Sequence, residues 1–109
     1  MSLSGTLSVQ PDDSVEFTFR LTNTGPDPVT LTFPSGLIVD FSVSDGTEEI
    51  WRWSENKMVI QAIQTRTVDP NQPLEESAVW KDPVLGSYTA TATLQARDVD
   101  VTAQQQFEI

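Results

Sequence analysis

Apolar and polar residues alternate with a period of two through most of this 109-residue chain. The clearest case is Val15–Thr22, in which Val15, Phe17, Phe19 and Leu21 are separated by single polar residues. Successive side chains of a β-strand point to opposite faces, so this pattern predicts a strand with one buried and one solvated face. Helical spacing of apolar residues is almost absent. The chain is therefore expected to be all-β.

Similar runs recur at intervals of roughly 8–12 residues, between turns rich in Gly, Pro and Asp. Besides Val15–Thr22, the predicted strands are an N-terminal run with Leu3, Leu7 and Val9, Val29–Phe33, Val39–Val43, Ile50–Ser54, Met58–Ile63, Thr65–Val68, Leu74–Trp80, Tyr88–Ala96 and a last strand within Val99–Ile109. About eight to ten short strands of this kind predict an immunoglobulin-like antiparallel β-sandwich of two sheets. No linker or internal repeat divides the sequence, so residues 1–109 are expected to form a single domain.

The residue types exclude most catalytic and metal chemistry. There is no Cys and no His, which rules out disulfides, thiolate zinc sites, Cys nucleophiles and His-based triads. Adjacent carboxylates such as Glu48 and Glu49 point to opposite faces of a strand or lie in turns. Asp98 and Asp100 share a face, but two carboxylates fall short of the roughly six to eight oxygens that Ca²⁺ takes. We expect no enzymatic activity, no cofactor and no metal site.

The charge is strongly negative, with 16 Asp and Glu against six Lys and Arg, a net −10 at pH 7. This argues against binding to nucleic acids and to anionic membranes, which need basic surfaces. The carboxylates are dispersed, and Lys57 and Lys81 are the only lysines. Such a composition favours a halophilic host over an ordinary acidic protein, because the repulsion is screened at about 1 M salt. The start MSLSGTLSV lacks the features of a signal peptide, which favours a cytoplasmic location.

The segment EIWRWSENKM is the most informative for binding. Trp51 and Trp53 are two residues apart, which places them on one face of a strand at about 6.6–7 Å. Two such indoles can stack on sugar rings or anchor a protein partner. They can equally fill the space between the sheets, and we favour this for at least one of them. Trp80 ends a predicted strand and is expected to be in the core or to cover an edge.

Several motifs together resemble a known family. FTFRLTNTGPDPVTLTFPSG (Phe17–Gly36), the pair Asp40-Phe41 and EIWRWSENKMVIQAI (Glu49–Ile63) are similar to the bacterial and archaeal intracellular proteinase inhibitors of the BsuPI type. Trp80 and GSYTATATL (Gly86–Leu94) stand where that family has its late Trp and its Gly-Xaa-Tyr strand. The resemblance implies a cytosolic inhibitor of an intracellular subtilisin-type serine protease. It also implies an immunoglobulin-like fold. Independently of the resemblance, we expect such an inhibitor to bind non-covalently through loops.

An inhibitor that binds in the manner of a substrate needs an exposed, extended and stiff loop. Three segments qualify, Ser54–Met58, Asp69–Pro73 and Lys81–Gly86, and Asn23–Pro28 adds a contact if it lies at the same end. A subtilisin-like pocket for large apolar side chains suits Leu85 or Met58, although Met58 is expected to tuck back onto the core. The candidate partner-binding residues are Trp51, Trp53, Ser54, Lys57, Met58, Lys81, Pro83 and Leu85.

Two other functions fit the same sequence. A generic immunoglobulin-like interaction module would bind another protein without affecting proteolysis, and the commonness of the fold supports it. A carbohydrate-binding module is the third possibility, and it requires that Trp51 and Trp53 are both exposed.

Overall fold

The structure, a computed structural model, describes residues 3–109 apart from the side chain of Asn56. This part of the chain is all-β, as predicted, with one short 3-10 helix, η1 (Trp53–Asn56). The strands are β1 (Leu3–Gln10), β2 (Ser14–Asn23), β3 (Val29–Phe33), β4 (Val39–Ser44), β5 (Glu49–Arg52), β6 (Gln64–Val68), β7 (Leu74–Lys81), β8 (Ser87–Leu94) and β9 (Thr102–Glu108).

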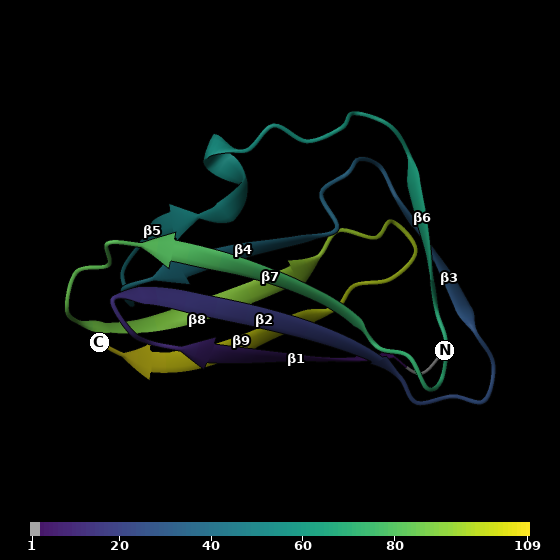
Figure 1. Cartoon of the computed structure of the whole chain (residues 1–109), viewed down its shortest axis with the longest axis horizontal. Coiled ribbons are helices and arrows are strands. Elements are labelled where there is room, and N and C mark those ends of the chain that lie inside the picture. The colour runs from purple at the N-terminus through teal and green to yellow at the C-terminus, as the bar shows by residue number, and fades with distance from the viewer. Residues whose placement is uncertain (1–2) are drawn as a thin grey trace.

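The strands form two packed antiparallel sheets and a separate ribbon. One sheet has the order β1-β2-β7 and the other β5-β4-β8-β9, while β3 and β6 pair only with each other. Figure 1 shows the two sheets as layers, with the β3–β6 ribbon standing at the end opposite to the β7–β8 loop. On one side of the sandwich β1 packs against β9, so β7 and β5 are the edge strands of the other side. The predicted immunoglobulin-like β-sandwich is confirmed.

The core follows directly from the alternation in β2. Val15, Phe17, Phe19 and Leu21 are all 1% exposed or less, whereas the residues between them face solvent or are half-buried. Phe17 stacks on Phe41 of the facing sheet, with ring centroids 6.3 Å apart. Burial of each large apolar side chain contributes about 1.5–3 kcal/mol. The same residues therefore define the strand and hold the two sheets together.

Asn23, at the end of β2, ties the β2–β3 loop to the ribbon. Its side-chain Nδ2 donates hydrogen bonds to the backbone oxygens of Asp27 (2.7 Å) and Val68 (2.9 Å). Its Oδ1 accepts one from the N–H of Gly25 at 2.9 Å. Asn23 is only 2% exposed, and both the nitrogen and the oxygen of its side-chain amide have hydrogen-bond partners, as buried polar groups normally do. The β2–β3 loop, which contains Gly25 and Pro26, is thus fixed by one buried side chain.

Two strand predictions need correction. The predicted strand Ile50–Ser54 ends at Arg52, and η1 begins at Trp53. The predicted strand Met58–Ile63 does not form at all, and Ile60 and Ile63 are 69% and 62% exposed. This segment crosses from β5 to β6 and meets no strand with which it could form a ladder. Its backbone bond to the rest of the fold is the one that Gly36 N–H donates to the Ile60 carbonyl, 2.7 Å.

Candidate functional site

A buried carboxylate fixes the point where β5 becomes η1. Asp40 of β4 is 6% exposed and accepts hydrogen bonds from Arg52 Nη1 (2.8 Å), Ser54 Oγ (2.8 Å) and Ser54 N–H (3.2 Å). Arg52 also donates to both carboxylate oxygens of Glu49, at 3.1 and 2.5 Å. The hydrogen bonds to Glu49 and then Asp40 raise the pKa of Arg52 above its ordinary value. Arg52 and Ser54 flank Trp53, so this network fixes the chain on both sides of Trp53.

All three tryptophans meet between the edge strands β5 and β7. Trp51 stacks on Phe17 and on Trp80, with ring centroids 5.6 and 6.2 Å apart. The ring centroid of Trp53 lies 6.4 Å from that of Trp51, and the two ring planes are tilted by 57°. Trp80 is 9% exposed, as predicted for a core or edge-covering residue, while Trp51 and Trp53 are half-buried. Beside them is a hollow of about 480 Å³, which we call the tryptophan groove, lined by Trp51, Arg52, Trp53, Lys57, Val79, Trp80 and Lys81.

The arrangement of the indoles bears on sugar binding. A sugar chain stacks best on aromatic rings that present flat, open faces. The stacked contacts of Trp51 with Phe17 and Trp80 occupy its ring, and the tilt between Trp51 and Trp53 prevents a common plane. The two residues therefore form part of the wall of a groove and are half-buried rather than openly exposed, and this geometry disfavours the carbohydrate-binding alternative.

The segment that leaves the groove after Lys57 is the most exposed apolar stretch. Met58 is 102% exposed, so the expectation that it tucks back onto the core is wrong. Lys57 has an extended backbone, φ −114° and ψ 138°, and no turn or bend occurs before Ala62. The segment is held on both sides of Met58. Lys57 N–H donates to the Ser54 carbonyl (3.3 Å), and the Ile60 carbonyl accepts from Gly36.

Gly36 explains how the segment can come so close to the sandwich. A Cβ at this position would lie 3.3 Å from the backbone nitrogen of Ile60 and 3.5 Å from its carbonyl oxygen. Any side chain would therefore press on the backbone that Gly36 binds. The Ser-Gly turn that carries part of the family resemblance thus packs against the Met58 segment and binds its backbone at Ile60.

The β7–β8 loop leaves the groove after Lys81 and is anchored differently. Tyr88 Oη donates to the Val84 carbonyl at 2.6 Å, and Gly86 exchanges two backbone hydrogen bonds with Ile109, at 3.3 and 2.9 Å. Leu85 is 78% exposed and Pro83 is half-buried. The chain bends at Asp82, whose φ is +52°, and again at Leu85. This loop is therefore anchored to β8 and to the C-terminal residue, but it is not extended.

The other two predicted loops lie elsewhere. Asp69–Pro73 forms a tight turn, closed by the hydrogen bond from Gln72 N–H to the Asp69 carbonyl, 3.1 Å. Asn23–Pro28 is bound to β6 through Asn23. Both are at the end of the β3–β6 ribbon, away from the β7–β8 loop (Figure 1). Among the predicted site residues, Trp51, Trp53, Lys57 and Lys81 come together in the groove, and Ser54, Met58, Pro83 and Leu85 lie on the segments next to it.

Two important residues of this region were not predicted from the sequence. Asp40 and Arg52 form the network that positions Trp53. The only indication of these two residues in the sequence is the family resemblance, which rests on the pair Asp40-Phe41 and on the run Trp-Arg-Trp-Ser. Local alternation of apolar residues says nothing about a hydrogen bond across 12 or 14 residues.

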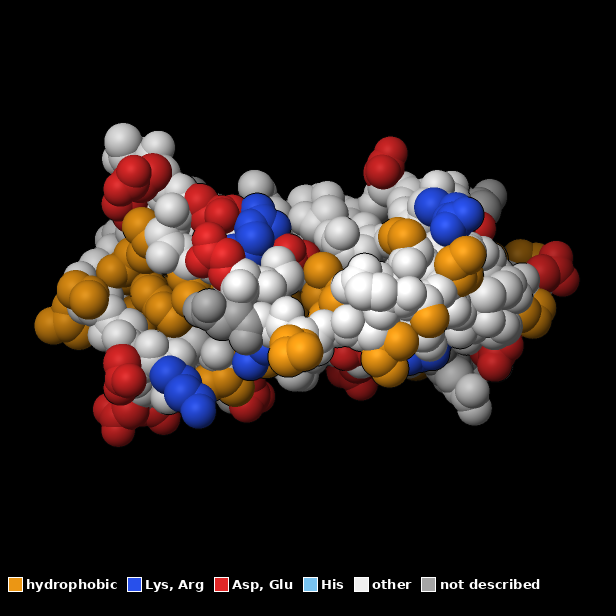
Figure 2. Space-filling view, turned by 90° about the horizontal axis from the view of Figure 1, so that it is seen from above, with side chains coloured by type: hydrophobic (Ala, Val, Ile, Leu, Met, Phe, Trp, Pro, Cys, Tyr) orange, Lys and Arg blue, Asp and Glu red, His pale blue; other side chains and the backbone are white. Residues whose placement is uncertain are grey.

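Figure 2 shows this side of the molecule in space-filling form. Hydrophobic side chains gather at the end that carries the β7–β8 loop, and acidic and basic side chains border them. The large exposed apolar residues of the described chain are Ile50, Met58, Ile60, Ile63, Val79, Val84 and Leu85. Val84 and Leu85 belong to the end with the β7–β8 loop, and clustered exposed apolar side chains of this kind are typical of protein-interaction surfaces.

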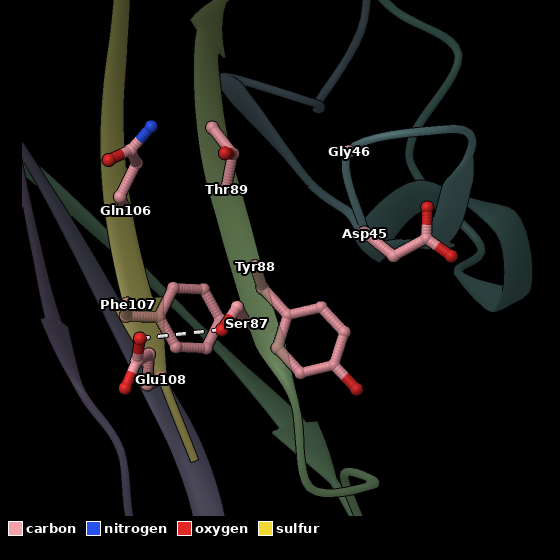
Figure 3. Close-up of a pocket in the computed structure, with 8 residues that line it drawn as sticks. All are labelled: Asp45, Gly46, Ser87, Tyr88, Thr89, Gln106, Phe107 and Glu108. Atoms are coloured by element: carbon pink, nitrogen blue, oxygen red, sulfur yellow. Dashed lines mark hydrogen bonds between the residues drawn. The ribbon is translucent and has the colours of Figure 1, made fainter.

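A second hollow, of about 440 Å³, lies over the β4–β5 turn, β8 and β9 (Figure 3). The carboxylate of Asp45 points into its own turn, away from Ser87 and Glu108. It accepts hydrogen bonds from the N–H groups of Glu48 and Thr47, both 2.9 Å, which lower the pKa of Asp45. Gly46 completes this turn with φ +98°, as the Asp-Gly sequence predicts. The carboxylate of Asp45 therefore stabilises its own turn.

Within residues 3–109, no group of three or more Asp and Glu is placed so that it could hold a metal ion. Asp98, considered above for calcium, instead accepts a hydrogen bond from the N–H of Thr32 at 3.2 Å. No helix in the described chain is long and apolar enough to cross a membrane.

The molecule is thus an immunoglobulin-like β-sandwich with an aromatic groove between the edges of its two sheets. The sequence model of the intracellular proteinase inhibitor (BsuPI) family matches residues 2–99. The chain belongs to this family, which comprises inhibitors and not enzymes, and the resemblance seen in the sequence is confirmed. A comparison with curated proteins finds no significant match.

Among solved structures, the chain is similar to the CARDB domain of the PF1109 protein from Pyrococcus furiosus, determined in complex with di-metal ions. The TM-score is 0.54 at 17% identity, over 98% of this chain and 86% of that one. At this identity the likeness supports the fold alone.

Proposed function

We propose that the protein inhibits an intracellular subtilisin-type serine protease in the cytoplasm by non-covalent binding. The observation that carries the proposal is Met58, a large apolar side chain that is fully exposed next to the extended backbone of Lys57 and between two anchors. Membership of a proteinase inhibitor family supplies the class of partner. An exposed apolar side chain on a supported, extended segment is what a protease cleft binds, because little conformational entropy is lost on binding.

In this proposal the segment Lys57–Gln61 enters the cleft and Met58 fills a pocket for large apolar side chains. Leu85, on the β7–β8 loop, makes a second contact on the rim. The two segments start from neighbouring points, since Lys57 and Lys81 line the same groove. The conformation of the β7–β8 loop is stabilised by Pro83, Tyr88 and Gly86. The Met58 segment is anchored by Gly36 and by Lys57, which lies over the Trp53 ring. The interaction energy then resides in a few anchors, as in other protein interfaces.

The test is inhibition of the protease by variants of these two residues. Met58→Asp is expected to raise the inhibition constant about 30-fold or more, which corresponds to the roughly 2 kcal/mol of a hot-spot residue. Leu85→Asp is expected to raise it less, and Met58→Leu to change it little. Ile63→Asp is the matched control, because Ile63 is 62% exposed on the same stretch but lies beyond the Ile60 anchor.

If the wild type inhibits and Met58→Asp inhibits equally well, the proposed contact is wrong although the function holds. If the folded wild-type protein binds the protease without reducing its activity, the inhibition itself is wrong and the interaction-module alternative is favoured.

A further inference from the structure

The positive charges of this acidic protein are unevenly placed. The chain has six Lys and Arg, against 16 Asp and Glu. Three of the six, Arg52, Lys57 and Lys81, line the tryptophan groove, and they include both lysines of the chain. The groove is therefore a local concentration of cations on a molecule whose net charge is −10.

The two lysines differ from Arg52 in what they contact. Arg52 is held by Asp40 and Glu49, and Arg20 pairs with Glu75 at 3.5 Å. Within residues 3–109, neither Lys57 nor Lys81 forms an ion pair, although carboxylates are abundant. Lys57 instead lies over the Trp53 ring, with Nζ 3.9 Å from the ring centroid. Such a cation–π contact holds the ammonium group over the indole and leaves it able to bind an anion.

The rest of the lining is apolar. The three indoles and Val79, which is 38% exposed, provide hydrophobic surface between the two ammonium groups and the sheet edges. β7 is an edge strand with β2 as its one pairing partner in the described chain. η1 lies next to part of β7, so the rest of its outer edge can accept an extended chain as an added strand. The volume of about 480 Å³ is in the range of sites that enclose part of a ligand.

From these features we infer that the tryptophan groove binds an extended polypeptide segment in which acidic and apolar residues alternate. The carboxylates pair with Lys57 and Lys81, and the apolar side chains pack on Trp53 and Val79. This site shares Lys57 with the Met58 segment but does not involve Met58 itself, and it makes charge, as well as hydrophobicity, a determinant of which partner is bound. The inference rests on the groove itself and holds for a protease or for another protein partner.

The experiment uses the full chain at 0.15 M salt and the peptide acetyl-Glu-Leu-Glu-Val-Glu-Leu-amide. Tryptophan fluorescence reports on the groove directly, because all three tryptophans line it. We expect saturable binding that weakens as salt is raised towards 1 M, where screening is strong. The same peptide with Lys in place of Glu is expected to bind at least tenfold more weakly.

Matched double variants separate a local effect from net charge. Lys57→Gln with Lys81→Gln is expected to weaken binding about tenfold or more, and Lys57→Arg with Lys81→Arg to retain it. Arg66→Gln with Arg97→Gln removes the same charge from exposed sites outside the groove and is expected to change binding less than twofold. Circular dichroism of each variant verifies that it is folded.

Equal weakening by both Gln double variants would overturn the inference, since the effect would then be one of net charge. Binding of an acidic polysaccharide such as polygalacturonate without binding of the peptide would also overturn it, as would a dimer of this chain that buries the groove. The measurement contains no protease, so its failure would leave the proposed inhibition to its own test.

Discussion

At the scale of single residues, Asp40 has the largest effect on the candidate site. Asp40 and Asn23 are the buried polar side chains of the described chain. A buried carboxylate is costly unless it is paired and hydrogen-bonded, and Asp40 accepts bonds from Phe41 N–H, from Ser54 and from Arg52. These bonds fix the backbone on both sides of Trp53, where β5 ends and η1 begins. One side chain thus connects the interior of β4 to the lining of the tryptophan groove.

Asp40→Asn is expected to lower the free energy of unfolding by about 1–3 kcal/mol, because Arg52 and Ser54 lose a charged acceptor. The tryptophan emission should also become easier to quench with acrylamide as Trp53 loosens. The matched control is Glu49→Gln, which removes the exposed arm of the same network and should cost less than about 1 kcal/mol. Urea unfolding followed by fluorescence measures both variants, and equal losses would contradict the central role of Asp40.

At the scale of elements, the regular strands are predictable from the sequence and the irregular segments are not. The alternation in β2 and β8 defines their faces, since one side of each strand must be buried. Met58–Ile63 has a comparable number of apolar residues, yet it lacks a neighbouring strand and remains outside the sheets. Whether an apolar run pairs depends on residues far along the chain, which local periodicity does not contain.

The candidate site, too, was predictable in part from the sequence. Its residues Trp51, Trp53 and Lys57 were evident as types suited to binding, but their geometry was not. Trp53 leaves the strand because Ser54 bonds to Asp40, 14 residues away. Lys81 joins Lys57 because β7 and β5 are edge strands on the same side of the sandwich, which is a property of the sheet order.

The β2–β3 loop gives a prediction at this scale. Asn23→Ala removes the hydrogen bonds to Asp27, Val68 and Gly25 and leaves the buried Val68 carbonyl without its side-chain donor. We expect a loss of about 1–3 kcal/mol in the free energy of unfolding. Amide hydrogen exchange should show faster exchange at Gly25, with β8 and β9 unaffected. A stability unchanged within about 0.5 kcal/mol would show that the clamp is dispensable.

At the scale of the whole molecule, dispersed carboxylates and a modest core oppose each other. A net charge of −10 on 109 residues produces repulsion that destabilises the compact state in dilute salt. The core of the sandwich, centred on Phe17, Phe19, Phe33 and Phe41, must offset it. Salt that screens the repulsion should therefore stabilise the fold.

The melting temperature is expected to rise as KCl increases from 0.1 M to about 2 M, since the Debye length falls from about 10 Å to below 3 Å. Differential scanning fluorimetry with the three tryptophans as reporters measures it. A flat or falling melting temperature would contradict the interpretation of the charge as an adaptation to a salt-rich cytoplasm.

The central claim is inhibition of a protease, and an active-site titration tests it most directly. The intracellular subtilisin-type protease of the same organism is titrated with this protein while cleavage of a peptide substrate is followed. We predict a linear loss of activity that ends at one molecule of inhibitor per active site. Full activity in the presence of excess folded and uncleaved protein would contradict the claim.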